Sequence, residues 1–268
     1  MTRGPLAVLG AGAMGSAVLE AVLRTELYTP EQVRVTTLDE QAAQRWRERG
    51  VEVAADNAAA VTGAGVVLVA VKPADVPAVL SDIGGGLDAE AVVVSIAAGV
   101  RLATLAEHLP TGTAVVRVMP NTPALVGEGM SALSAGPACG EQALAAAREI
   151  LSACGRVVVV PEKQQDAVTA LSGSGPAYVF AIAEALIEGG VLLGLPRPTA
   201  TELAVQTLLG ASTMLADGER HPSLLREQVT SPGGTTAAAL REFDRHGLRS
   251  AIIAGMEAAR DRSLQLGD

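Results

Sequence analysis

The chain has 268 residues, a formal net charge of -9, and 49% hydrophobic, 18% charged and 2% aromatic residues. This length suggests roughly two domains, and the hydrophobic share at modest charge excludes an intrinsically disordered chain. The acidic balance and the scarcity of aromatic residues argue against nucleic-acid binding, which needs clustered Lys and Arg or stacking platforms.

Residues 1–160 alternate short β-branched runs with Ala-rich amphipathic segments. Continuous apolar runs are typical of strands that are covered on both faces. The alternation predicts an α/β domain with a doubly wound parallel sheet. We expect strands at 6–9, 33–37, 51–53, 66–71, 91–96, 114–118, 130–133 and 157–160, and helices at 14–23, 41–48, 74–80, 102–109 and 141–152.

Residues 161–268 contain no comparable β-rich runs. Helices are expected at 178–193, from Thr199 to about Gly218, at 235–246 and at 248–265. The 178–193 segment is apolar nearly all round, so it should be buried inside a domain or at an interface. The sequence therefore predicts a second domain, residues 161–268, that is all-α.

The sequence also bears on location. Cys139 and Cys154 make neither a disulfide framework nor a metal-spaced cluster, so we expect a reducing context without a metal site. Apolar runs such as 66–71 are much shorter than the ~20 residues that span a bilayer. Residues 1–5 lead into a strand-like run without the features of a signal peptide. We expect a cytoplasmic protein with no membrane partner.

The first expected strand ends in a Gly-x-Gly-x-x-Gly motif, residues 10–15. In a dinucleotide site, Gly10 permits the tight turn, Gly12 lets the backbone approach a pyrophosphate, and Gly15 lets helix and strand pack closely. The phosphates lie at the helix N-terminus. This position favours a Rossmann-type domain that binds NAD(P), although an ordinary tight β-α turn has the same glycines.

The end of the second strand bears on which dinucleotide binds. An Asp or Glu there would hydrogen-bond the ribose 2′-hydroxyl of NAD. The sequence has Thr36 and Thr37, whose hydroxyls leave room for a 2′-phosphate, whereas Asp39 lies slightly late for the carboxylate role. We therefore favour NADPH, with NADH as the alternative.

Three later strand ends carry turn residues, at 70–73, 95–99 and 119–123. In an open α/β sheet the ligand crevice lies outside the carboxyl ends of the strands, so these turns should converge on the cofactor. Each also has a simpler interpretation, since Lys72 fits a solvated charge and Asn121 fits an ordinary turn.

Two Gly- and Ser-rich segments, residues 172–178 and 231–236, precede helices of the second half. The second offers backbone N–H groups and two threonine hydroxyls at a helix N-terminus, which suits a substrate carboxylate. A threonine N-cap beside a glycine hinge would explain it equally well.

Taken in order, the motifs at 10–15, 70–73, 95–100, 119–124, 171–178 and 231–236 resemble those of pyrroline-5-carboxylate reductase. The resemblance extends from Leu6 to about Leu264. It implies reduction of 1-pyrroline-5-carboxylate to L-proline with NAD(P)H, the last step of proline biosynthesis. It also implies a homodimer through the helical domain, with each active site completed by the partner, and assembly of dimers into a decamer.

The resemblance further implies roles for individual residues. Thr236 is expected to hydrogen-bond near the imine nitrogen as the catalytic residue, and Glu162 is placed near the substrate by its position. The substrate contacts are Gly234, Thr235, Thr236 and Glu162. The cofactor contacts are Gly10, Ala11, Gly12, Ala13, Met14, Gly15, Thr36, Asn57, Ala70, Val71, Lys72, Pro73, Ala97 and Ala98.

Two other activities remain open on sequence grounds. A β-hydroxyacid dehydrogenase, or an imine-reductase-like enzyme acting on another small carboxylate, shares a Rossmann domain followed by helices. Alcohol oxidation needs a base, and residues 175–181 contain no Lys, which favours imine reduction. A catalytically silent NAD(P) sensor would need no second carboxylate-binding segment, so residues 231–236 argue against it.

Overall fold

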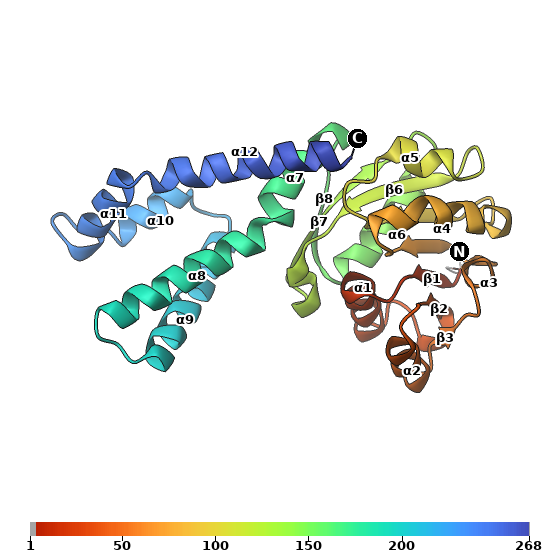
Figure 1. Cartoon of the computed structure of the whole chain (residues 1–268), viewed down its shortest axis with the longest axis horizontal. Coiled ribbons are helices and arrows are strands. Elements are labelled where there is room, and N and C mark those ends of the chain that lie inside the picture. Colours follow the sequence, from red (N-terminus) through yellow and green to blue (C-terminus); the bar gives the residue numbers. More distant parts are fainter. Residues whose placement is uncertain (1–3, 268) are drawn as a thin grey trace. The chain divides into compact units, whose positions relative to one another are not determined.

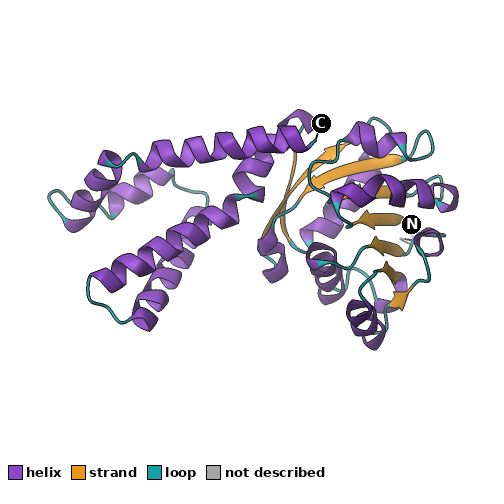
Figure 2. Ribbon diagram, viewed as in Figure 1, coloured by secondary structure: helices purple, strands orange, loops and turns teal. Residues whose placement is uncertain are grey.

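The computed structural model describes residues 4–267, which divide into two compact units. Unit 1 contains the described residues up to Ser174 together with those from Ala259 onward, and unit 2 is Gly175–Ala258. The expected boundary at residue 160 therefore precedes the division by one short helical segment, because residues 161–174 pack with the sheet. The strands lie in unit 1, and unit 2 is helical (Figure 2).

Unit 1 is built on an eight-stranded sheet in the order β3-β2-β1-β4-β5-β6-β7-β8 (Figure 1). The parallel-dominated, Rossmann-like α/β architecture confirms the expected fold class. The strands are β1 (Leu6–Leu9), β2 (Val33–Thr36), β3 (Glu52–Val53), β4 (Val66–Val69), β5 (Val92–Ser95), β6 (Ala114–Met119), β7 (Gly129–Ala135) and β8 (Gly155–Val159).

Strand β7 departs from the expected parallel sheet, because it pairs antiparallel with β6. The connection from Met119 to Gly129 holds only a 3-10 helix, η4 (Thr122–Val126). A parallel crossover needs about a dozen residues or more, so this connection is too short to bring the chain back to the end of the sheet where β6 begins. Strand β8 then pairs parallel with β7.

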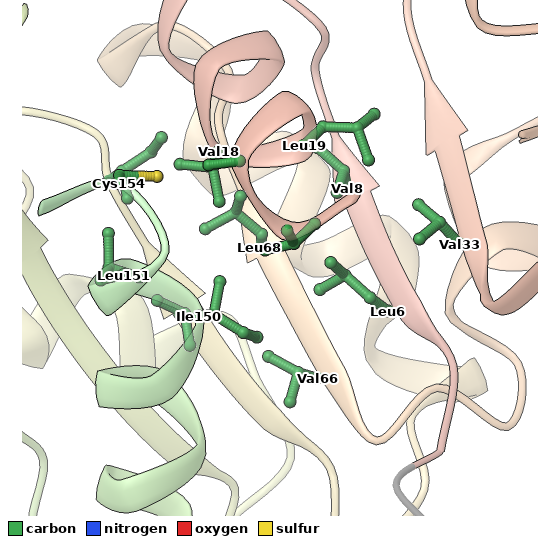
Figure 3. Close-up of a cluster of buried hydrophobic side chains, with 14 of the residues drawn as sticks. Leu6, Val8, Val18, Leu19, Val33, Val66, Leu68, Ile150, Leu151 and Cys154 are labelled. Carbon is green, nitrogen blue, oxygen red and sulfur yellow. The ribbon is translucent and has the colours of Figure 1, made fainter. Parts of the chain in front are cut away.

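The helices of unit 1 cover both faces of the sheet, which explains why the central strands β1 and β4 are apolar throughout. Successive strand residues point to opposite faces. Leu6 and Val8 join a core with α1 and α6, shown in Figure 3, whereas Ala7 and Leu9 join a second core with α3, α4 and α5. The helices are α1 (Ala13–Arg24), α2 (Glu40–Glu48), α3 (Asn57–Val61), α4 (Val76–Ile83), α5 (Leu102–Glu107) and α6 (Glu141–Ser152).

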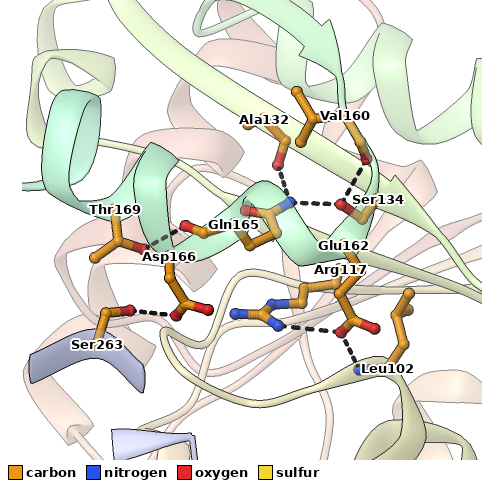
Figure 4. Close-up of polar contacts among 10 residues, drawn as sticks. All are labelled: Leu102, Arg117, Ala132, Ser134, Val160, Glu162, Gln165, Asp166, Thr169 and Ser263. Carbon is orange, nitrogen blue, oxygen red and sulfur yellow. Dashed lines mark hydrogen bonds and ion pairs between the residues drawn. The ribbon is translucent and has the colours of Figure 1, made fainter. Parts of the chain in front are cut away.

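A helical segment that the sequence did not predict follows β8. It consists of η5 (Glu162–Gln164), α7 (Gln165–Val168) and a π-helical turn, η6 (Thr169–Gly173). The buried Gln165 Nε2 donates to the Ala132 carbonyl at 3.1 Å and to Ser134 Oγ at 2.8 Å. Asp166 accepts a hydrogen bond from Ser263 at 2.7 Å (Figure 4). These contacts fasten the segment to β7 and to the last turns of α12 (Leu248–Leu266) within unit 1.

Unit 2 contains α8 (Gly175–Leu192), α9 (Arg197–Ala216), α10 (Pro222–Gln228), α11 (Thr235–Arg245) and the first part of α12. The all-α prediction is confirmed, although α10 was not predicted and α9 begins at Arg197 rather than at Thr199. Helix α8 packs along α9 closely enough that a Cβ at Gly190 would lie 3.0 Å from the Ala200 Cβ. Chain reversal between them uses Gly194 in the left-handed region, at φ 97°.

Helix α8 was expected to be buried either inside a domain or at an interface. It is not buried within the chain, which leaves the interface. Phe180 is 67% exposed, and Val179 and Leu186 are exposed as well. The continuous helical run Glu162–Leu192 has a mean hydropathy of 1.3 over its most apolar window, and none of that window is buried. By length and composition alone this helical run could cross a membrane, as the core helices of many soluble proteins could, so it does not overturn the expectation of a chain without a membrane partner. Exposed apolar surface of this kind marks an interaction site.

Candidate functional site

The three glycines of the β1–α1 turn have different surroundings. Gly10 has φ 100°, and a Cβ there would lie 2.8 Å from the Ala70 carbonyl oxygen. A Cβ at Gly15 would overlap the Gly10 carbonyl oxygen. Exposed Gly12, the N-cap of α1, has no atom within 4 Å of a built Cβ. The chain itself thus requires glycine at Gly10 and Gly15, whereas at Gly12 the backbone faces open space that a phosphate can approach.

The end of β2 meets the start of α3 through two half-buried polar side chains. Thr36 Oγ1 donates to Asn57 Oδ1 at 2.7 Å. Asp39 serves a different purpose, because its carboxylate caps α2 by accepting from the amides of Gln41 at 2.9 Å and Ala42 at 3.3 Å. The nearest carboxylate after β2 is therefore engaged by its own helix, and Thr36 is the polar side chain at the strand end.

The turns after β4 and β5 follow strands that lie next to β1 in the sheet order β1-β4-β5. Ala70 N donates to the Leu9 carbonyl at 2.8 Å, and Ile96 N donates to the Val69 carbonyl at 3.0 Å. Ala97 is buried, whereas Ala98 and Lys72 are exposed. Strands β2, β1, β4 and β5 are adjacent and parallel, so the structure gathers residues 10–15, Thr36, 70–73, 97 and 98 at one edge.

The turn after β6 has a structural explanation. Asn121 Oδ1 accepts from the Met130 amide at 2.8 Å, and Asn121 Nδ2 donates to the Ser172 carbonyl at 3.1 Å. The side chain thus joins the β6–β7 connection to the π-helical turn η6. Both hydrogen-bonding groups of Asn121 are engaged within unit 1.

Glu162, which sequence analysis placed near the substrate, lies in a polar cluster of unit 1. Its Oε1 accepts from the Leu102 amide at 2.6 Å and from Arg117 Nη1 at 3.0 Å (Figure 4). Arg117 was not among the expected site residues. The signal for it was an arginine in the middle of the apolar run 114–118, where a buried charge needs a partner.

The candidate substrate residues lie in unit 2, at the start of α11. The Gly234 amide donates to the Ser231 carbonyl at 3.0 Å, and Gly233 has φ 69°, which closes a turn with Pro232 at its second position. A Cβ at Gly234 would collide with Ser231 Oγ. No side chain from the described part of the chain caps α11. The first amides of α11 and the hydroxyls of Thr235 and Thr236 are suited to bind an anion.

The cysteines do not have the surroundings of activated nucleophiles. Burial raises the pKa of Cys154 to about 11, against a smaller opposing effect of Arg24. Burial also raises the pKa of Cys139. Because the thiolate is the reactive form, neither residue is set up for covalent catalysis.

Two family models match the chain, one in the sheet-containing part and one in the helical part. Residues 162–266 match the family model described as pyrroline-5-carboxylate reductase dimerisation, and residues 5–99 match that of the coenzyme F420-dependent NADP oxidoreductases. A pyrroline-5-carboxylate reductase of Corynebacterium melassecola is 46% identical over 98% of both chains.

Two solved structures are also similar. That of a pyrroline-5-carboxylate reductase from Coxiella burnetii has a TM-score of 0.94 and 33% identity, with full coverage of both chains. That of the Plasmodium falciparum pyrroline carboxylate reductase with NADP bound has a TM-score of 0.89 and 28% identity, again with full coverage. The chain belongs to the pyrroline-5-carboxylate reductase family.

Proposed function

We infer that the chain transfers a hydride from NAD(P)H to the C=N bond of 1-pyrroline-5-carboxylate and forms L-proline, the last step of proline biosynthesis. The observation that carries this function is the 46% identity to a pyrroline-5-carboxylate reductase over 98% of both chains. The purified protein should oxidise NADPH when 1-pyrroline-5-carboxylate is added, with proline as product. No rate above that of a substrate-free control would refute the assignment.

The same assay separates the competing activities. A β-hydroxyacid dehydrogenase would reduce NADP⁺ with a 2- or 3-hydroxy acid, and a silent sensor would bind nucleotide without turnover. We expect neither, because residues 175–181 supply no lysine base and residues 231–236 form a second potential anion site.

Reduction of an iminium requires little acid-base catalysis by the protein. The nicotinamide supplies the hydride when it is bound. A substrate that binds as the iminium is already electrophilic at carbon, so the site has mainly to orient it and exclude water. We propose that the first amides of α11, with Gly234 and Thr235, bind the carboxylate while the Thr236 hydroxyl hydrogen-bonds near the imine nitrogen. A threonine hydroxyl is too weak an acid to be an efficient proton donor near neutral pH.

Thr236→Ala tests this role. Loss of one hydrogen bond to a charged substrate should lower kcat/KM by roughly ten- to a hundredfold. NADPH affinity should stay near that of the wild type, since Thr236 is proposed to contact the substrate. Steady-state kinetics and NADPH titration measure the two effects, and Thr236→Ser, which keeps the hydroxyl, is the matched control. Unchanged kinetics in Thr236→Ala would remove Thr236 from the site.

The cofactor site proposed for residues 1–160 comprises Thr36, Asn57, and residues 10–15, 70–73, 97 and 98. We propose NADPH as the preferred cofactor, with weaker use of NADH. Thr36 stands at the strand end with its hydroxyl 2.7 Å from Asn57 Oδ1, and the Asp39 carboxylate caps α2. This leaves the 2′-phosphate a neutral, hydroxyl-bearing environment.

Thr36→Asp should reverse the preference. A carboxylate at this position repels a 2′-phosphate but can accept from a ribose 2′-hydroxyl, so kcat/KM with NADPH should fall at least about tenfold relative to NADH. Thr36→Ser keeps the hydroxyl and should retain the NADPH preference. A wild-type enzyme that prefers NADH would contradict the proposal directly.

Residues 161–268 are proposed to bind substrate and to form the oligomer. The match to a dimerisation model supports oligomerisation, and the exposed apolar helix α8 supplies a surface that a second chain can cover. We propose a homodimer whose sites are completed by the partner, assembly of dimers into a decamer, and a cytoplasmic location.

A further inference from the structure

Arg117 and Glu162 form a partly buried ion pair in unit 1. Arg117 lies on β6 between Val116 and Val118, and its side chain is 8% exposed. A guanidinium buried in this way is costly unless it is paired and hydrogen-bonded. Its partner is Glu162 Oε1 at 3.0 Å, so β6 fixes the position of this carboxylate.

The same oxygen also holds the start of α5. It accepts a hydrogen bond from the Leu102 amide at 2.6 Å. Leu102 is the first residue of α5, where backbone amides lack partners within the helix, and no side chain at the N-cap position, Arg101, supplies one. Glu162 therefore satisfies this amide from outside the helix.

The short loop between Ser95 and Leu102 contains proposed cofactor contacts. Ala97 and Ala98 lie in it, and Gly99 adopts φ 79°. At its first end, the Ile96 amide is bound to the Val69 carbonyl on the neighbouring strand. At its second end, the Leu102 amide is bound to Glu162. The position of Glu162 thus helps to determine where the cofactor loop lies.

We propose that Glu162, held in place by Arg117, is a positioning residue for the loop at Ala97 and Ala98 and is not a substrate ligand. The proposal rests on the proposed function, because it takes those two alanines as cofactor contacts. It replaces the sequence expectation for Glu162 with a different role. The consequence is that substitution of Glu162 should change cofactor binding far more than substrate binding.

Because of its other contacts, the helical segment that carries Glu162 should stay in place when the Glu162 carboxylate is removed. The helical segment that carries it has two independent anchors, since Gln165 binds Ala132 and Ser134, and Asp166 binds Ser263. Removing the Glu162 carboxylate leaves these hydrogen bonds in place. Two groups lose their partner: the Arg117 guanidinium, which stays buried on β6 and makes some loss of stability expected, and the Leu102 amide at the end of the loop.

The first experiment compares Glu162→Ala with Glu162→Gln. Glutamine keeps an acceptor for the Leu102 amide but loses the charge that pairs with Arg117. NADPH affinity, measured by fluorescence titration without substrate, should weaken about tenfold in Glu162→Ala and less in Glu162→Gln. KM for 1-pyrroline-5-carboxylate at saturating NADPH should change less than about twofold.

A stability control accompanies these variants. Leu151→Ala opens a cavity in the core cluster of α1 and α6, on the opposite face of the sheet from Ala97 and Leu102. It should lower the melting temperature while changing NADPH affinity much less than Glu162→Ala does, although Ala11 and Met14 pack in the same cluster. If Leu151→Ala weakens NADPH binding as much as Glu162→Ala does, the effect is one of general stability and the positioning role is wrong.

A second pair of variants tests the backbone amide itself. Leu102→Pro removes the N–H that Glu162 accepts, and proline is tolerated at the first position of a helix. Leu102→Ala also loses the leucine side chain but keeps the N–H. We expect NADPH affinity to weaken more in Leu102→Pro than in Leu102→Ala. Equal affinities would overturn the proposal even if a Glu162 variant failed to fold.

The outcomes separate this proposal from the proposed function. If Glu162→Ala raises KM for the substrate and leaves NADPH affinity intact, Glu162 is a substrate ligand and the positioning role is refuted. A wild-type protein that binds NADPH but does not reduce 1-pyrroline-5-carboxylate refutes the proposed function alone, and the titrations still decide the role of Glu162.

Discussion

A Gly15→Ala variant is expected to lose NADPH binding and much of its stability. The added Cβ would overlap the Gly10 carbonyl oxygen and lie 2.9 Å from the Ala70 Cβ. Neither contact can be relieved by rotating a side chain, so the β1–α1 turn has to shift. Overpacking of this kind costs roughly 1–3 kcal/mol or more, out of a total of about 5–15 kcal/mol for a typical domain. Urea unfolding and NADPH titration measure the two losses.

Gly12→Ala is the matched control for this prediction. No atom lies within 4 Å of its built Cβ, so the change in unfolding free energy should stay within about 1 kcal/mol, the cost of alanine at a helix N-cap. The methyl group would nevertheless occupy the space proposed for the pyrophosphate, so NADPH affinity should fall at least about tenfold. A Gly12→Ala protein that binds NADPH normally would contradict this placement of the phosphates.

Phe180→Glu is expected to dissociate the proposed homodimer and to abolish most of the reductase activity. Phe180 is 67% exposed on α8, and it lines a surface groove with Glu184, Ile187 and Arg197. Covering this helix with a second chain would bury the new carboxylate, which costs several kcal/mol when unpaired. Light scattering after size exclusion measures the mass, and activity at the same concentration tests whether the partner completes the site.

Phe180→Leu controls for the loss of the aromatic ring. It keeps the surface apolar, so the oligomer and its activity should persist with a modest loss of affinity between protomers. If Phe180→Glu retains the wild-type mass, a second copy of the chain does not cover this face of α8. If it becomes monomeric and remains fully active, the proposal that the partner completes each site is wrong.

Fold class could be predicted from the sequence because the sheet is covered on both faces. In β1 and β4 every residue is buried, and adjacent residues enter opposite cores, so the strands appear as unbroken apolar runs. The antiparallel direction of β7 follows from its short connection to β6, and the expected strands at 114–118 and 130–133 already contained that signal. Helices α3 and α10 are too short to show a clear period.

The candidate site was predictable where local geometry restricts residue type. Gly10 and Gly15 are required by contacts with neighbouring backbone, and the motif carries this requirement directly. The N-cap role of Asp39 is also local, since the carboxylate binds amides two and three residues later. The role of Glu162 was less accessible, because its carboxylate binds the amide of a helix start that lies 60 residues earlier in the chain. Long-range pairing of this kind leaves no periodic signal.

The discontinuity of unit 1 affects the order in which the protein can fold during synthesis. Residues from Ala259 onward belong to this unit, and the buried Ser263 donates its hydroxyl to Asp166. They leave the ribosome only after all of unit 2 has been made. Domains usually fold as units from the N-terminus during translation. Here the sheet can assemble early, but the hydrogen bond between Ser263 and Asp166 and the packing of Leu266 against Gly99 can form only after the whole of unit 2 has been synthesised.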